Sequence, residues 1–239
     1  MLGPRVKPED DGEGAGAVEN PMLNLDALAK RPATPQPFNH VEAEGLLPEE
    51  AREALARDFP DPGKTGFFPV EDLTYGPAFA ELLEDVKSPE FSRIVGEKLD
   101  RDLVSRPQMI VARKWSALKD GRVHTDGQDK VATALVYLND DWNTDAGGAL
   151  RFLAGPDLDG PGTDPIPARY GGFAAFARSD SSWHGHKPFA GERRVLQVFW
   201  LQDEEAAARK GKRHRRNRWL KALWPFHGAA AATGAVARE

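Results

Sequence analysis

A histidine and an aspartate separated by one residue are the clearest chemical signal in the sequence. They are His124 and Asp126 in the segment RVHTDG. If this segment is extended, both side chains lie on one face, because side chains alternate along a strand. A third ligand from a distant strand would complete two histidines and one carboxylate, a set that holds a metal ion and leaves coordination positions open. The candidates for that ligand are His184 and His186 in SSWHGHKP.

A simpler interpretation of the same residues is a hydrogen-bonded turn, in which Asp126 and Gly127 form an Asx-type cap.

The chain contains no cysteine, which excludes disulfides, iron–sulfur clusters and cysteine nucleophiles and leaves His, Asp and Glu as metal ligands. The run SDSSWH places Ser, Asp and His close together. Triad members normally come from separate elements, and no Gly-x-Ser-x-Gly motif is present, so a serine hydrolase is disfavoured.

The elements that must position these residues change in character along the chain. Residues 1–37 are rich in Gly, Pro and charge, which predicts a disordered segment. Residues 38–107 are predicted to be a mostly helical support region of the same domain, with proline-started helices at 77–87 and 89–99. A further helix is expected from Pro48 to about Phe59.

Residues 108–205 have short apolar or alternating runs separated by Gly, Asp and Pro, a pattern typical of antiparallel strands in a sandwich, barrel or jelly roll. A long loop from Leu153 to Pro167 is a candidate functional loop. The 23 Gly and 19 Pro also argue against a helical bundle. The predicted strands are Met109–Trp115, Val131–Leu138, Ala149–Leu153, Phe173–Ala177 and Val195–Leu201.

The charge is distributed unevenly. Residues 209–221 hold eight Lys or Arg and no acid, so a total of −5 leaves −13 on the rest of the chain. An acidic body argues against nucleic acid as a partner. Residues 206–239 are predicted to be a basic helix and tail. The tryptophans and leucines of 209–224 are expected either to pack on the domain or to contact an anionic membrane peripherally. With no secretory signal or apolar span, the predicted location is cytoplasmic.

Two longer stretches resemble the iron(II)- and 2-oxoglutarate-dependent oxygenases, specifically the branch containing the prolyl hydroxylases. HTDGQDKVATALVYLNDDWNTDAGGALRFL resembles the family's segment from the His-x-Asp motif through the next two strands. RYGGFAAFARSDSSWHGHKPFAGERRVLQVFWLQD resembles the second half, with a distal histidine, a proline four residues later and an arginine that opens the last core strand. The fold this implies is mainly β with flanking helices (α+β). Its core would be a double-stranded β-helix, or jelly roll, supported by N-terminal helices.

The resemblance assigns roles to particular residues. His124, Asp126 and His184 match the iron ligands, which are also the catalytic residues. His186 is expected to point to the opposite face of its strand and to be partly exposed. For the arginine that binds the distal carboxylate of 2-oxoglutarate we expect Arg194, because it lies ten residues after His184, a spacing that matches the family. Arg193 is the alternative and fits better when the count starts from Gly191. The two point to opposite faces, so only one can enter the cosubstrate site.

Tyr137 matches a tyrosine that helps to bind the same carboxylate in part of the family, or else it is a core residue. One departure concerns the segment before His124. Related hydroxylases commonly carry a tyrosine there that lines the cosubstrate site, and this chain has Lys114 and Trp115.

The implied reaction uses iron(II), 2-oxoglutarate and O2, with ascorbate as a further candidate reductant. It would hydroxylate a C–H bond of a prolyl or other amino-acid or peptide substrate and release succinate and CO2. Two alternatives stay open. One is a nucleic-acid or nucleotide dealkylating oxygenase, which usually carries a second arginine six residues after the first, where this chain has Phe199 and Trp200. The other is a non-catalytic jelly-roll binding module. The sequence carries no signal for an oligomeric state.

Overall fold

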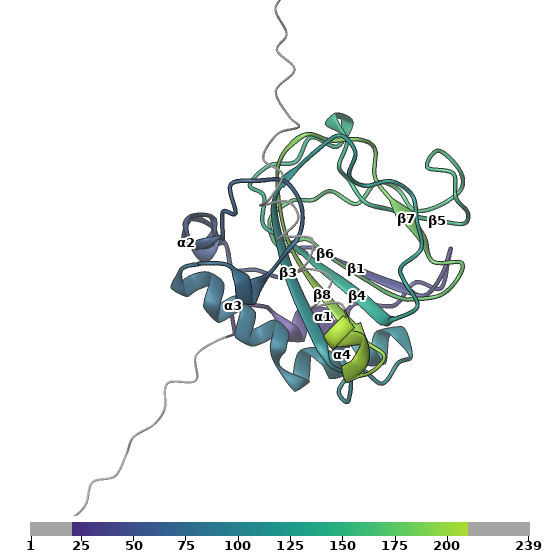
Figure 1. Ribbon diagram of the computed structural model, residues 1–239, viewed down its shortest axis with the longest axis horizontal. Helices are drawn as coiled ribbons and strands as arrows, with labels where there is room; N and C mark the ends of the chain where they lie inside the picture. The colour runs from purple at the N-terminus through teal and green to yellow at the C-terminus, as the bar shows by residue number, and fades with distance from the viewer. Residues whose placement is uncertain (1–20, 210–239) are drawn as a thin grey trace, which may run out of the picture.

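The strands form two antiparallel sheets that face each other (Figure 1). The computed structural model describes residues 21–209. The large sheet has the strand order β1-β6-β4-β8-β3-β2, and the small sheet pairs β5 with β7. The strands are β1 (His40–Ala43), β2 (Phe68–Pro69), β3 (Gln108–Ser116), β4 (Lys130–Tyr137), β5 (Arg151–Leu153), β6 (Phe173–Ala177), β7 (Trp183–Gly185) and β8 (Gly191–Leu201).

The helices cover one face of the large sheet. Phe91 stacks on Trp200 of β8 with ring centroids 5.6 Å apart, and both belong to the largest buried cluster. Ser88 ends one helix and caps the next, because its hydroxyl accepts a hydrogen bond from the Phe91 amide. The helices are α1 (Leu25–Lys30), α2 (Arg52–Asp58), α3 (Pro77–Lys87) and α4 (Pro89–Leu99), with short 3-10 turns at Glu49–Ala51, Val70–Asp72 and Thr144–Ala146.

The two faces of the central strand β8 have different partners. Leu196, Val198 and Trp200 pack with the helices, whereas Val195 packs with Tyr137 and Phe152 between the two sheets. Because side chains alternate along a strand, even-numbered residues of β8 face the helices and odd-numbered residues face the interior of the jelly roll. This interior is where a site between the sheets must lie.

The predicted fold class is confirmed: the core is a mainly antiparallel β structure buttressed by helices. The strands expected in 108–205 and the helices expected in 38–107 are present. The short strands β1 and β2 were not expected. The strand β1 closes the edge of the large sheet against β6, so the region 38–107 contributes to the sheet as well as to its support.

The expected disorder of residues 1–37 is wrong for residues 21–37. Leu23 and Leu28 are fully buried in the helix-side core, and the Leu23 amide donates a hydrogen bond to Asp85. Asn24 caps α1 by accepting a hydrogen bond from the Ala27 amide. Two buried leucines therefore anchor a segment whose average composition is polar. The basic segment 209–224 lies outside the described residues, except for Arg209.

No helix in residues 21–209 is both long enough and apolar enough to cross a lipid bilayer.

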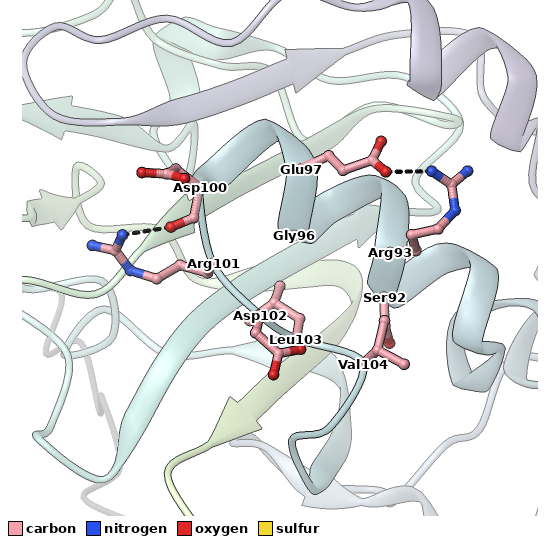
Figure 2. A pocket seen from close by; sticks show the side chains of 9 residues that line it. All are labelled: Ser92, Arg93, Gly96, Glu97, Asp100, Arg101, Asp102, Leu103 and Val104. Carbon is pink, nitrogen blue, oxygen red and sulfur yellow. Dashed lines mark hydrogen bonds and ion pairs between the residues drawn. The ribbon is translucent and has the colours of Figure 1, made fainter.

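A hollow of about 350 Å³ lies beside α4 and the turn after it, lined by Ser92, Gly96, Asp100 and Leu103 among others (Figure 2). Since Ser92 also accepts a hydrogen bond from Trp200, this hollow is on the helical side of the large sheet. It is not part of the jelly-roll interior.

Candidate metal centre

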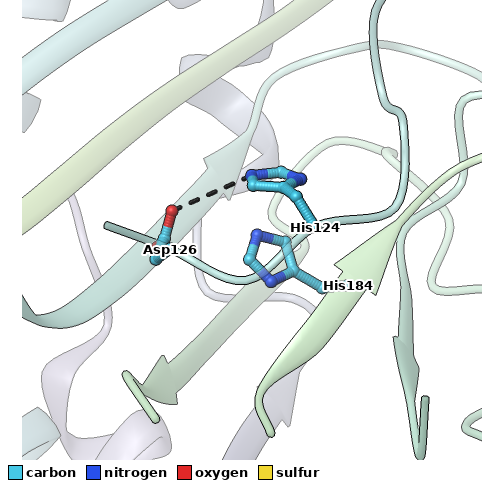
Figure 3. A group of neighbouring side chains, drawn as sticks. All are labelled: His124, Asp126 and His184. Atoms are coloured by element: carbon cyan, nitrogen blue, oxygen red, sulfur yellow. Dashed lines mark ion pairs between the residues drawn. The ribbon is translucent and has the colours of Figure 1, made fainter. Parts of the chain in front are cut away.

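The structure brings His124, Asp126 and His184 together between the two sheets (Figure 3). One ligand atom from each residue lies within 4.8 Å of the others. In the described part of the chain, this is the only such group of three or more His, Asp or Glu side chains. The predicted trio therefore converges, although its members come from segments separated by almost sixty residues.

A pair of backbone hydrogen bonds sets the two histidines side by side. The His124 amide donates to the His184 carbonyl over 3.0 Å, and the His184 amide donates to the His124 carbonyl over 2.9 Å. This isolated antiparallel bridge extends the small sheet, in which His184 is also paired with Phe152. The imidazole centroids are consequently 4.4 Å apart.

Each imidazole is held in the orientation that a metal ligand needs. Nδ1 of His124 lies 2.8 Å from the Arg122 carbonyl oxygen, and Nδ1 of His184 lies 3.0 Å from the Ser182 carbonyl oxygen. A carbonyl can only accept a hydrogen bond, so Nδ1 carries the proton in both rings. The Nε2 lone pairs are left available for a metal, the usual arrangement of ligating histidines.

The carboxylate of Asp126 is fixed from the large sheet. Lys130 donates to its Oδ1 and Thr133 donates to its Oδ2, each over 2.6 Å. Burial by itself would raise the pKa of Asp126, but the Lys130 charge, the His184 charge and these two hydrogen bonds lower it to about 2. Sequence reasoning missed Lys130 and Thr133. They lie four and seven residues after Asp126, and this spacing indicates a contact with Asp126 only when the turn that leads into β4 is known.

The trio is buried on one side and open on the other. Asp126 and His184 are 5% and 7% exposed, whereas the side chain of His124 is 55% exposed. Burial lowers the pKa of His184 to about 4, despite the opposing charge of Asp126. At neutral pH the trio thus offers a neutral imidazole and an ionised carboxylate in a buried setting, the protonation states that divalent metals require. Two histidines and one carboxylate suit iron(II) with open positions.

Arg193 and Arg194 point to opposite faces of β8. Arg193 is 2% exposed and faces the interior, where its guanidinium carbon lies 5.4 Å from the Tyr137 ring centroid. Its Nε donates to the Gly148 carbonyl over 2.9 Å. Arg194 faces the other way and pairs with Glu192 over 2.6 Å. The expectation that Arg194 enters the pocket is therefore wrong, because odd-numbered residues of β8 face the interior. Arg193, the alternative, occupies that place.

Tyr137 is fully buried beside Arg193, and its hydroxyl has no hydrogen-bond partner among the described residues. Burial raises the pKa of Tyr137, an effect that the nearby Arg193 charge opposes. A neutral phenol that can donate a hydrogen bond thus lies next to a guanidinium. This pair has the chemistry to bind a carboxylate.

Comparison with known proteins agrees with this geometry. Residues 114–202, which include every site residue named above, match the profile of the 2OG-Fe(II) oxygenase superfamily. These residues form a 2OG-Fe(II) oxygenase domain. The predicted enzyme class and its cofactors, iron(II) and 2-oxoglutarate, are confirmed at the level of this superfamily.

Several solved structures are similar to the oxygenase. A Pseudomonas putida prolyl-4-hydroxylase is 18% identical, covers 75% of this chain and 97% of its own, and has a TM-score of 0.47. A Trichoplax adhaerens prolyl hydroxylase in complex with a hypoxia-inducible-factor peptide is 15% identical, with coverages of 78% and 90% and a TM-score of 0.46. HygX from Streptomyces hygroscopicus with iron bound is 13% identical, with coverages of 68% and 82% and a TM-score of 0.44. No curated protein sequence matches the chain.

His186 is placed differently from our expectation. It is 6% exposed, and burial together with the charges of Arg193 and Arg113 lowers its pKa to about 4. The prediction of a partly exposed side chain on the opposite face is wrong, because residues two apart share a face of an extended segment. Its ring also lies directly against Gly121, where an added Cβ would come within 2.1 Å of it.

Lys114 and Trp115, the residues noted before the His-x-Asp motif, lie outside the pocket. Lys114 Nζ and Trp115 Nε1 both donate to Asp61, over 2.9 and 3.0 Å. Arg113, the residue before them, is buried at 7% exposure and is paired with Val195 of the interior face of β8. Sequence reasoning missed it.

The metal-free oxygenase should lose stability between pH 7 and pH 5. His184 and His186 have folded pKa values of about 4, below the ordinary 6.5. The unfolded chain therefore takes up protons first, so stability is full above about pH 6.5 and falls as the pH drops toward 4. Each histidine should contribute a loss on the order of 2 kcal/mol over this interval. Urea unfolding at the two pH values measures the loss, and His186→Asn should remove about half of it. Equal stability at both pH values would contradict neutral, buried histidines.

Replacing Thr133 with valine should weaken metal binding by roughly 10- to 100-fold, the usual effect of losing a partner of a metal ligand. Valine keeps the shape of threonine but removes the hydrogen bond to Asp126 Oδ2, so the carboxylate is less well oriented. Competition with a chromophoric chelator measures the metal affinity. Thr133→Ser restores the hydroxyl and serves as the matched control. Equal affinities of the valine and serine variants would show that the hydroxyl does not orient Asp126.

Proposed function

We propose that this protein is an iron(II)- and 2-oxoglutarate-dependent dioxygenase that hydroxylates a C–H bond of a prolyl or other amino-acid side chain, in a peptide or as a free amino acid. His124, Asp126 and His184 would hold the iron, and Arg193 with Tyr137 would hold 2-oxoglutarate. The observation that carries the proposal is the convergence of the three ligand side chains, at mutual distances within 4.8 Å, inside a domain of this superfamily.

Different residues of the chain would bind the metal, orient its ligands and bind the cosubstrate. Iron(II) with 2-oxoglutarate and O2 supplies the oxidising power for hydroxylation, with succinate and CO2 as coproducts. The Nε2 atoms of the two histidines and the Asp126 carboxylate would hold the metal, as a set of three ligands that leaves coordination positions open. Lys130 and Thr133 orient Asp126, and the carbonyls of Arg122 and Ser182 orient the imidazoles. Arg193 and Tyr137 provide a guanidinium and a phenol for the far carboxylate of the cosubstrate.

The exposure of the ligands supports an approach by a large substrate. His124 is more than half exposed, whereas Asp126 and His184 are buried. A side chain protruding from a peptide can therefore reach the metal from the His124 side without entering a closed cavity. The preference for prolyl or other amino-acid substrates comes from the resemblance of residues 124–153 and 169–203 to the prolyl hydroxylase branch.

The dealkylating alternative lacks its second arginine. The positions six residues after the two arginines are Phe199 and Trp200, which are 7% and 0% exposed and pack in apolar clusters. No described observation favours nucleic acid over an amino-acid substrate.

Anaerobic titration of the metal-free protein with iron(II), followed by 2-oxoglutarate, tests the reaction class. We expect a weak visible charge-transfer band that requires both additions, and succinate once air is admitted. Proline-containing peptides, free amino acids and alkylated oligonucleotides, tested in parallel, should show that peptides or amino acids stimulate succinate formation. Absence of the band and of succinate in folded, metal-loaded protein would contradict the reaction class. Stimulation only by oligonucleotides would contradict the substrate class.

A further inference from the structure

Arg113 on β3 is a buried cation whose ion pair with a carboxylate is too long for a hydrogen bond. Its side chain is 9% exposed, and its nearest acidic partner is Asp120, at 3.6 Å. The only other polar contact of the guanidinium is a long one, 3.4 Å from Nη1 to the Ser116 hydroxyl. Its Nε is buried and has no hydrogen-bond partner among residues 21–209. The guanidinium carbon lies over the Phe67 ring, 3.9 Å from its centroid.

The sheet register places Arg113 next to the proposed cosubstrate site. Val195 of β8 is paired with Arg113 on one side and with Tyr137 of β4 on the other. Arg193 lies two residues before Val195, on the same interior face. Arg193 is therefore flanked by Tyr137 from one neighbouring strand and by Arg113 from the other. Two of the buried side-chain atoms that lack a hydrogen-bond partner among the described residues, the Tyr137 hydroxyl and Arg113 Nε, belong to these flanking residues.

The side chains around Arg113 and Arg193 carry more positive than negative charge. Burial lowers the pKa of Arg113 to about 10; the charge of Asp120 opposes this effect and the charge of Arg193 adds to it. Two buried positive charges thus face one partly exposed aspartate. Buried charges of one sign are unfavourable unless an anion is bound near them.

We propose that Arg113 is a second guanidinium of the cosubstrate site and that, with Arg193, it holds the 2-oxoglutarate carboxylate farthest from the metal. The inference rests on the proposed function and adds a binding residue to it. Arg193 uses its Nε for Gly148, so its Nη atoms can pair with a carboxylate, while the Arg113 Nε can reach the same group from β3. A carboxylate between two guanidiniums and a phenol has more donors than a single arginine can offer.

Calorimetric titration of 2-oxoglutarate into zinc-loaded protein tests the proposal without turnover, because zinc has no redox chemistry. Arg113→Gln should weaken 2-oxoglutarate binding roughly 10- to 100-fold, as expected for losing a charge-assisted hydrogen bond. Lys114→Gln is the matched control, since it removes one positive charge from the adjacent residue outside the pocket, and it should bind as wild type. Arg113→Lys should recover part of the affinity. Binding of 2-oxopentanoate, which lacks the distal carboxylate, should be the same in wild type and Arg113→Gln.

Three results would overturn the proposal. The first is wild-type affinity for 2-oxoglutarate in Arg113→Gln, even if the KM for the peptide or amino-acid substrate rises. The second is an equal loss of 2-oxopentanoate binding, which would mean that Arg113 shapes the pocket without contacting the carboxylate. The third is an equal loss of 2-oxoglutarate binding in Arg113→Gln and Arg113→Lys, with a lower thermal midpoint of both metal-free variants, which would indicate a packing role on Phe67.

The Arg193→Gln variant separates this proposal from the proposed function. If Arg193→Gln loses binding and Arg113→Gln does not, only the role of Arg113 fails. If metal-loaded wild-type protein does not bind 2-oxoglutarate at all, the proposed function fails and the role of Arg113 fails with it.

Discussion

Replacing His184 with glutamine should lower the iron(II) affinity by at least about 100-fold, because the loss of a partner of a ligand alone lowers affinity 10- to 100-fold. Succinate formation should fall to background. His184 supplies the one fully oriented Nε2 in the buried half of the site, and an amide oxygen is a weaker ligand held in a different position. Metal content after gel filtration and the charge-transfer band with 2-oxoglutarate measure the two effects.

His40→Gln is the matched control for this variant. His40 is also a buried histidine of the jelly roll, at 2% exposure, and its Nδ1 lies 2.8 Å from the carbonyl oxygen of Phe38, two residues before it, as His184 Nδ1 lies 3.0 Å from that of Ser182. Its ring contacts Phe152, the residue paired with His184. The two substitutions therefore disturb packing to a similar degree. Equal metal loss in both variants would mean that the effect comes from packing and would argue against His184 as a ligand.

Replacing Arg193 with glutamine should weaken 2-oxoglutarate binding on the order of 1,000-fold, since truncating one partner of a buried ion pair costs about 3–5 kcal/mol. Arg194→Gln should change the affinity by less than about fivefold, because a partly exposed ion pair with Glu192 contributes little. The two variants differ by one position in the chain, so they share composition and charge. Calorimetry with zinc-loaded protein measures both affinities.

The opposite ranking would contradict the assignment of the interior face of β8. If Arg194→Gln lost binding and Arg193→Gln did not, the odd-numbered residues of β8 could not be those that face the cosubstrate. Val195 and Tyr137 would then also be misplaced, because the same alternation puts them between the sheets. The pair of variants therefore tests the strand register as well as the role of one arginine.

The first two metal ligands could be predicted from the sequence because their determinants are local. His124 and Asp126 are two residues apart and share a face of an extended segment whatever surrounds it. The choice of His184 over His186 came from the family resemblance, in which a proline follows the distal histidine by four residues, as Pro188 does here. The helices at 77–87 and 89–99 were also predictable, since a proline start and an apolar stripe are local signals.

The choice between Arg193 and Arg194 could not be predicted in this way. Counting residues from His184 and from Gly191 gave different answers, and the register between β3 and β8 shifts at this point, between Arg113 and Trp115. A shift of one residue moves every side chain to the other face of a sheet. Only the pairing of β8 with both of its neighbours decides which arginine is buried.

Residues 21–37 are a second case in which the sequence did not predict which side chains are buried. Their average composition is polar, yet Leu23 and Leu28 are fully buried because the helix-side core offers them a place. Composition averages over a segment, whereas packing acts on individual side chains.

The sequence by itself determined the ligand types, their local spacing and the class of fold. The tertiary structure alone decided which side chains surround the ligands: Lys130 and Thr133 on Asp126, and Arg113 and His186 beside Arg193. The physical reason is that spacing within one strand follows from backbone geometry. Contacts between strands depend instead on register and on how the two sheets pack, which are properties of the whole domain.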